Sequence, residues 1–188
     1  MKAGLLLLSG GAGHRMGAPK HALDHPDGGS WGGHLVRVFE AVFPGAPVLV
    51  LGDPLPDRPA LPRLDDPRQG PAVALRTWAS AEIPEADHWW IVACDQVRWT
   101  PERLLAWVER AQAADPAGRH WVVAQQDSHI QPLGGWFPAA LRPELLTTTS
   151  RSLLGLVEGL PHVLLPSDGP EWQDVDSPEE RRAFEDEG

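Results

Sequence analysis

Apolar positions along the chain follow two spacings, one typical of buried strands and the other of amphipathic helices. Short continuous apolar runs predict strands at residues 4–8, 47–51, 88–94, 121–124 and 133–137. Apolar residues at helical spacing predict helices at residues 35–43, 72–81, 101–114, 153–157 and 178–184. This alternation indicates an α/β fold with three layers and a mostly parallel sheet.

Polar residues mark the starts of two of these helices. Thr100 precedes Pro101, as expected of an N-cap followed by proline at the first helical position. Ser177 precedes the last helix, with Glu180 at the capping-box position. Residues 53–71 form a proline-rich stretch between two elements, and loops of that length are often functional.

Length and composition limit the classes of protein that fit. A chain of 188 residues with 42% hydrophobic content predicts one domain spanning residues 1–188. The net charge of -10 argues against a nucleic-acid binder, and no apolar run reaches the length of a membrane span. Cys94 is the only cysteine, so no intramolecular disulfide can form, and no secretory signal precedes the first strand. We therefore expect a soluble cytoplasmic protein that binds neither nucleic acid nor membrane.

The charge is unevenly distributed along the chain. Residues 168–188 hold nine acidic residues and two arginines, whereas residues 1–23 contain Lys2, Arg15 and Lys20 and no carboxylate. An anion is therefore expected to bind near the end of the first strand.

A glycine-rich loop follows that strand, with the sequence SGGAGHRMGAPK at residues 9–20. Glycines let backbone N–H groups approach a phosphate, and Arg15 and Lys20 add positive charge. The loop is not a dinucleotide fingerprint, because Met16 stands where the third glycine belongs, and it lacks the Gly-Lys-Ser/Thr of a Walker A loop. Asp95 follows the third predicted strand. Since the carboxyl ends of parallel strands meet at one edge of a sheet, the loop and Asp95 should share a crevice.

The loop resembles the N-terminal signature of the nucleotidyltransferases, in which an apolar strand is followed by G-x-G-x-R-M, a short gap and lysine. Gly11, Gly13, Arg15, Met16 and Lys20 match it. The later segments QGPAVAL (69–75), ACDQV (93–97), QPLGGWF (131–137) and DVDSPEE (174–180) occur in the order found in the molybdenum cofactor guanylyltransferases, the MobA-type family.

The resemblance implies a Rossmann-like nucleotidyltransferase domain that transfers GMP from GTP to the phosphate of molybdopterin, with Mg²⁺ as cofactor and pyrophosphate as product. The partners it implies are GTP and molybdopterin or Mo-molybdopterin. Family analogy adds other cofactor-assembly proteins and molybdoenzymes.

The resemblance also implies roles for individual residues. Catalytic roles fall to Arg15, Lys20 and Asp95. The nucleotide is bound by Leu8, Ser9, Gly10, Gly11, Gly13, Lys20, Asp95 and one of Asp65 and Asp66. Asp95 and Asp176 hold the metal, and Gln131 and Arg151 bind the acceptor. This set suits the chemistry, because Mg²⁺ is commonly held by one or two carboxylates plus substrate phosphates, and fixed positive charge stabilises the departing pyrophosphate. Trp136 is a candidate for stacking on a flat acceptor ring.

Four positions depart from the family pattern. Ser9 stands where the family usually has alanine. Pro19 stands where the family often has aspartate, and Asp174 and Asp176 stand where it prefers asparagine. Two alternatives therefore remain: a CTP-dependent molybdopterin cytidylyltransferase, and a nucleotide-binding module without catalysis. Gly10 followed by Gly11 favours guanine over cytosine. The eight histidines and the single cysteine show no Cys/His ligand spacing, which argues against a zinc site.

Overall fold

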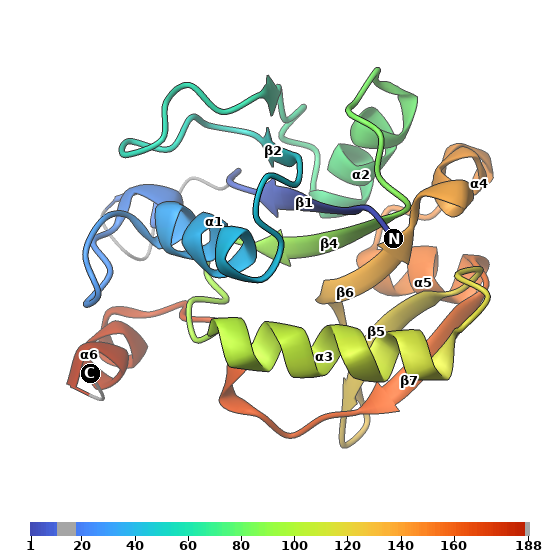
Figure 1. Cartoon of the computed structure of the whole chain (residues 1–188). Coiled ribbons are helices and arrows are strands. Elements are labelled where there is room, and N and C mark those ends of the chain that lie inside the picture. The colour runs from blue at the N-terminus through green and yellow to red at the C-terminus, as the bar shows by residue number, and fades with distance from the viewer. Residues whose placement is uncertain (11–17, 187–188) are drawn as a thin grey trace.

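A seven-stranded sheet forms the centre of the fold in the computed structural model, whose described residues are 1–10 and 18–186 (Figure 1). Its strand order is β3-β2-β1-β4-β6-β5-β7. The strands are β1 (Ala3–Leu8), β2 (Val48–Leu51), β3 (Arg63–Leu64), β4 (His88–Ala93), β5 (Trp121–Gln126), β6 (His129–Pro138) and β7 (His162–Pro166). Only β6 runs antiparallel to its neighbours, β4 and β5, so the predicted mostly parallel sheet is confirmed.

Helices cover both faces of this sheet (Figure 1). One face is covered by α1 (Trp31–Val42) and α3 (Pro101–Ala114), and the other by α2 (Pro71–Ser80), α4 (Arg142–Thr147) and α5 (Leu153–Gly159). The last helix, α6 (Pro178–Asp186), lies at the side toward which β1 and β4 point (Figure 1). Within residues 1–10 and 18–186, no helix is long and apolar enough to cross a membrane.

Strand β1 shows why both faces of the sheet are covered by helices. Its six residues are all buried, and they alternate between two apolar cores: Leu5 and Leu7 pack on the side of α1 and α3, and Leu6 and Leu8 pack on the side of α2. Trp89 and Trp90 divide between the same two cores and are fully buried. The central strands are therefore anchored on both sides, and the loops at their carboxyl ends start from fixed positions.

Both predicted helix caps are confirmed. The Thr100 hydroxyl accepts a hydrogen bond from the N–H of Arg103, and Ser177 and Glu180 exchange hydrogen bonds as a capping box does. Among the strands and α-helices of the described residues, three were not predicted: β7, β3 and α4. Strand β7 is half-buried and ends in proline, β3 has two residues, and α4 has six, so none of them has a strong periodic pattern.

Candidate functional site

Three charged side chains from distant segments meet beyond the carboxyl ends of β1 and β4. Lys20 begins the short helix η1 (Lys20–Ala22), Asp95 follows β4, and Asp176 precedes α6. The Nζ atom of Lys20 donates a hydrogen bond to Oδ2 of Asp95 at 2.8 Å and another to Oδ1 of Asp176. We call these residues, together with the neighbouring Asp174, the carboxylate–lysine cluster. The sequence predicted that Lys20, Asp95 and Asp176 act at one site, and the fold brings them into contact.

A small apolar cluster explains why the three segments converge. Leu23, Val97 and Val175 pack together with Trp31 and Phe184. Leu23, Val97 and Val175 lie within three positions of Lys20, Asp95 and Asp176, respectively. The N–H of Val175 also donates to the carbonyl of Asp95 at 3.1 Å, which ties the C-terminal segment to the end of β4. Burial of apolar side chains therefore supplies the free energy that holds the charged groups together.

Gln96 is a positioning residue that the sequence argument missed. Its side chain is almost fully buried, accepts a hydrogen bond from the N–H of Ala93 at 3.4 Å and donates one to the carbonyl of Leu133 at 3.2 Å. It bridges β4 and β6 at the point where the register between them ends at Ile91 and Gly135. The backbone beside Asp95 is thereby fixed. In the sequence, the only sign of this role was a glutamine directly after a strand-end aspartate.

The electrostatics of the cluster favour an added cation. Burial alone would lower the pKa of Lys20, but attraction to Asp95 and hydrogen bonds to Asp176 and Asp95 raise it above its ordinary value. The pKa of Asp174 is raised to about 7, first because surrounding protein atoms exclude water and then because Asp95 and Asp176 carry negative charge. Three carboxylates thus share one ammonium group.

The donor set also fits a divalent ion that prefers oxygen ligands. Oδ1 of Asp95 is buried and has no hydrogen-bond partner among residues 1–10 and 18–186. A buried carboxylate oxygen without a partner is costly unless a cation or donor approaches it. Asp95 and Asp176 supply the carboxylate oxygens that Mg²⁺ or Mn²⁺ takes.

A second part of the site is a pocket of about 330 Å³ beside the end of β1. Its lining residues are Leu8, Gly10, Asp66, Arg68, Gly70, Pro71 and Ala74. Only one of the two candidate aspartates lies here. Asp65 is 90% exposed and pairs with Arg63 at 3.1 Å, whereas Oδ1 of Asp66 accepts the N–H of Arg68 at 2.8 Å.

Gly10 lies against Asp66 in this pocket. A Cβ atom at residue 10 would stand 2.0 Å from Oδ2 of Asp66, so only glycine allows this approach. Arg68 has a φ of 56°, a left-handed backbone conformation at the turn that brings its N–H to the carboxylate. Ser9 is fully buried, and its hydroxyl donates to the carbonyl of Asp53 at 2.7 Å. Its side chain therefore fastens β1 to the loop after β2.

Several predicted site residues lie elsewhere or outside the described part. Gly11, Gly13 and Arg15 belong to residues 11–17, which are not among the described residues. Gln131 lies in β6, half-buried and paired with Ala124, while Arg151 is exposed just before α5.

The proposed stacking role of Trp136 is wrong. Its side chain is 1% exposed and packs in the core against His88 and Phe43, because inward-facing positions of β6 are covered by α1 and α3. It cannot present a ring to a ligand.

Comparison of sequences identifies one family. The sequence profile of the family described as MobA-like NTP transferase domain matches residues 5–163. A search of curated protein sequences gave no match.

Solved structures share the fold over nearly the whole chain. Rv0371c from Mycobacterium tuberculosis H37Rv has a TM-score of 0.72 at 22% identity, covering 98% of this chain and 99% of that one. A structure of Rv0371c in complex with manganese has a TM-score of 0.65 at 20% identity, covering 98% and 97%. Molybdopterin-guanine dinucleotide biosynthesis protein A from Archaeoglobus fulgidus has a TM-score of 0.71 at 15% identity, covering 97% of each chain.

A cytidylyltransferase is also similar. The 2-C-methyl-D-erythritol 4-phosphate cytidylyltransferase from Thermus thermophilus has a TM-score of 0.66 at 14% identity, covering 96% of each chain. At these identities the likeness shows a common nucleotidyltransferase α/β fold and leaves the choice of nucleotide open.

Proposed function

The chain belongs to the MobA-like NTP transferase domain family, and on that premise we propose that it transfers GMP from GTP to the terminal phosphate of molybdopterin. An oxygen of the acceptor phosphate attacks the α-phosphorus of GTP and forms the new P–O bond. The bond between the α-phosphorus and the bridging oxygen breaks, and pyrophosphate leaves with that electron pair. No base is needed, because the acceptor phosphate is already ionised at neutral pH.

Lys20, Asp95 and Asp176 would organise the phosphates in this reaction. Asp95 and Asp176 hold the divalent ion, which, when bound, neutralises charge on the triphosphate. Lys20 turns its ammonium from the carboxylates toward the phosphate oxygens, where it stabilises the charge that develops on pyrophosphate. Arg15 is proposed to assist it.

The observation that favours guanine is the contact between Gly10 and Asp66. A carboxylate only accepts hydrogen bonds, and guanine offers neighbouring N–H donors at N1 and N2. Cytosine offers one amino group beside two acceptors, which a carboxylate repels. Asp66 therefore distinguishes the two bases by charge as well as by hydrogen bonding.

The acceptor and the setting of the reaction follow from the family. The Archaeoglobus protein is described as acting in molybdopterin-guanine dinucleotide biosynthesis, which supports molybdopterin as the acceptor. We assign contacts with it to Gln131 and Arg151. The reaction would take place in the cytoplasm, with other cofactor-assembly proteins and molybdoenzymes as partners.

A second candidate is transfer from CTP, because the Thermus thermophilus protein of similar fold is described as a cytidylyltransferase. The test is thermal unfolding with Mg²⁺ plus GTP, CTP or ATP, followed through the nine buried tryptophans. A ligand at ~100 times its Kd stabilises by about 2.7 kcal/mol. Stabilisation by GTP alone supports the proposal, and stabilisation by CTP alone replaces it with cytidylyl transfer. Binding of GTP without pyrophosphate release when molybdopterin is added would identify a nucleotide-binding module.

A further inference from the structure

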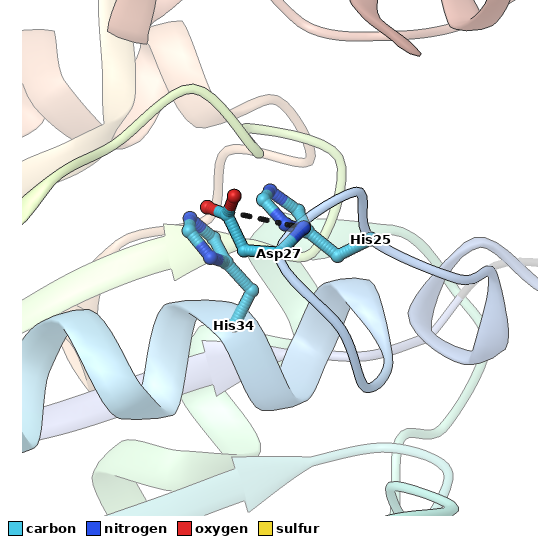
Figure 2. A group of neighbouring side chains, drawn as sticks. All are labelled: His25, Asp27 and His34. Atoms are coloured by element: carbon cyan, nitrogen blue, oxygen red, sulfur yellow. Dashed lines mark hydrogen bonds and ion pairs between the residues drawn. The ribbon is translucent and has the colours of Figure 1, made fainter. Parts of the chain in front are cut away.

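A second group of potential ligands lies at the start of α1, outside the carboxylate–lysine cluster. His25 and Asp27 belong to the loop before α1, and His34 lies in its first turns (Figure 2). One donor atom from each of the three lies within 4.8 Å of the other two. The imidazole rings of His25 and His34 stack with their centroids 3.6 Å apart, and the Asp27 carboxylate lies beside them (Figure 2). We call the two rings the histidine pair.

Backbone carbonyls fix which ring nitrogens carry hydrogen. Nε2 of His34 lies 3.0 Å from the carbonyl oxygen of Trp99, and Nε2 of His25 lies 3.4 Å from that of Val97. A carbonyl oxygen only accepts, so both Nε2 atoms donate and both Nδ1 atoms keep a lone pair. The N–H of Asp27 donates to Nδ1 of His25 at 3.1 Å, in agreement with that assignment, and an ion bound at this nitrogen would replace that hydrogen bond. Histidine ligands of metal ions usually donate their other ring N–H to a carbonyl or carboxylate in this way.

Burial lowers the pKa of His25, and burial together with the neighbouring His25 lowers the pKa of His34 to about 4. Neutral imidazole is the form that binds metal.

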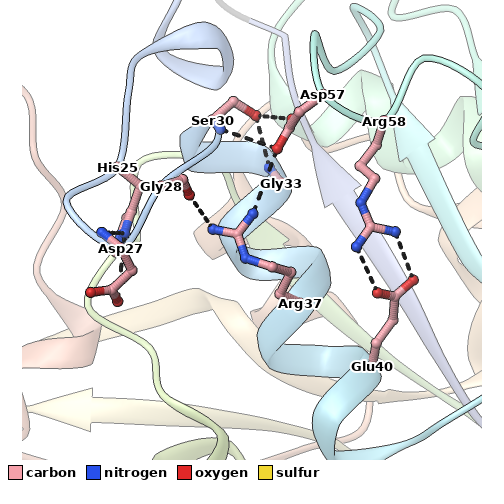
Figure 3. Close-up of polar contacts among 9 residues, drawn as sticks. All are labelled: His25, Asp27, Gly28, Ser30, Gly33, Arg37, Glu40, Asp57 and Arg58. Carbon is pink, nitrogen blue, oxygen red and sulfur yellow. Dashed lines mark hydrogen bonds and ion pairs between the residues drawn. The ribbon is translucent and has the colours of Figure 1, made fainter.

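The loop that supplies His25 and Asp27 is held in place at its other end (Figure 3). Asp57 accepts hydrogen bonds from the hydroxyl of Ser30 at 2.5 Å and from its N–H at 3.2 Å. Arg37 pairs with Asp57 at 3.6 Å and donates to the carbonyl of Gly28. Ser30 in turn caps α1 by accepting the N–H of Gly33. The ligands would therefore lose little conformational freedom on binding an ion.

The spacing suits a tetrahedral transition-metal ion. With bonds of 2.0–2.1 Å, two ligand nitrogens of such an ion stand about 3.3 Å apart, which is compatible with ligand atoms that all lie within 4.8 Å of one another. The rings lie 8° from parallel, so each must tilt about its Cβ–Cγ bond to aim its lone pair at the ion, and this torsion is soft in histidine. An adjoining pocket of about 260 Å³ leaves room for that movement and for water as a fourth ligand.

We propose that His25, Asp27 and His34 bind a divalent transition-metal ion such as Zn²⁺ at a site separate from the nucleotidyl-transfer centre. Two imidazoles and one carboxylate select Zn²⁺ over Mg²⁺, which prefers oxygen ligands. The ion would stabilise the packing of α1, the segment Val97 to Trp99 and Phe184 of α6, whose ring contacts that of His25 at 5.3 Å. The segment Val97 to Trp99 follows Asp95 in sequence, and α6 follows Asp176.

The test is calorimetric titration of chelator-treated protein, without an affinity tag, with ZnCl₂. We expect one ion to bind at the histidine pair in the wild type and in Asp95→Asn. Affinity should fall more than about 100-fold in His34→Gln and His25→Gln, since loss of an outer partner alone costs 10- to 100-fold. His129→Gln, at an exposed position on β6, is the matched control and should bind as the wild type does.

Asp27→Asn keeps the proposal testable if the buried histidine variants do not fold. The Asp27 side chain is 76% exposed, so the variant should fold normally and still lose at least about tenfold in Zn²⁺ affinity. Absence of Zn²⁺ binding by the wild type would overturn the proposal. Equal binding by the His34→Gln and Asp27→Asn variants would overturn it too, as would loss of the ion in Asp95→Asn alone.

Discussion

The carboxylate–lysine cluster and the histidine pair lie near one another in the fold but are built in opposite ways. The first combines residues 20, 95 and 176, so it forms only when the sheet and the C-terminal segment are in place. The second lies within ten residues of one loop and helix start. The first offers charged oxygens and an ammonium group, and the second offers neutral nitrogens with one carboxylate. The different donor atoms of the carboxylate–lysine cluster and the histidine pair thus suit different metal ions.

The largest effect is expected when the buried metal ligand of the carboxylate–lysine cluster is removed. This change should leave the histidine pair intact and so separates the two sites. Asp95→Asn should lower nucleotidyl transfer by about 100- to 1000-fold, because the divalent ion loses its buried ligand. Zn²⁺ affinity at the histidine pair should not change. Steady-state pyrophosphate release and Zn²⁺ titration on the same preparation measure both. A variant that loses both properties would show that the two places act as one.

Lys20→Ala should come next, with a loss of about 100-fold in kcat/KM for GTP. The ammonium no longer meets the phosphates, yet it also no longer competes for the carboxylates of Asp95 and Asp176. Mn²⁺ should therefore bind the variant at least as tightly as the wild type without nucleotide. Weaker Mn²⁺ binding would mean that Lys20 is needed to shape the ion site.

Asp66→Asn should change the choice of base more than the rate. A hydrogen bond to a charged group contributes about 1.5 to 3 kcal/mol, so the preference for GTP over CTP should fall by roughly 10- to 100-fold. Asp65→Asn is the control, since Asp65 faces solvent and pairs with Arg63. Ratios of kcat/KM for the two nucleotides measure the effect, and an equal loss in the control would contradict the assignment.

The smallest expected effect concerns the loop that holds the histidine pair. Burial alone would raise the pKa of Asp57, but hydrogen bonds from Ser30 and the nearby Arg37 hold it below its ordinary value. Because the folded pKa is lowered, its stabilisation is fully present above about pH 4 and is lost as the pH falls through the folded value. Asp57→Asn should therefore reduce the free energy of unfolding by about 1 kcal/mol at pH 7 and by less at pH 3.

Urea unfolding of the wild type and Asp57→Asn at the two pH values tests this. GTP-dependent turnover of Asp57→Asn should stay close to that of the wild type. A difference in stability that grows toward pH 3 would contradict the role given to Asp57.

The sequence predicted the parts of the fold that have strong patterns. The run at β1 and the capped helix α3 appear where apolar spacing and Thr100 placed them. Strand β6 was predicted shorter than it is, and its antiparallel direction was not foreseen, because its glycines and polar residues weaken the period. Strand β7 was not predicted because its side chains are only half-buried, so its apolar pattern is weak.

The residues of the two sites also differ in how far the sequence could predict them. Lys20, Asp95 and Asp176 could be grouped because each stands beside a motif typical of the family. Asp65 and Asp66 could not be separated by sequence, since only the turn at Arg68 decides which carboxylate faces the pocket. The argument from spacing considered pairs of histidines one helical turn apart. His25 and His34 are nine positions apart, and they were missed because they meet only when a loop folds back onto α1.

The most direct test of the account is pyrophosphate release from GTP, with Mg²⁺ and purified molybdopterin, by the wild type and Asp95→Asn. We expect release that depends on molybdopterin, is faster with GTP than with CTP, and is lost in the variant. Release from neither nucleotide by the wild type, or equal rates in the variant, would contradict it.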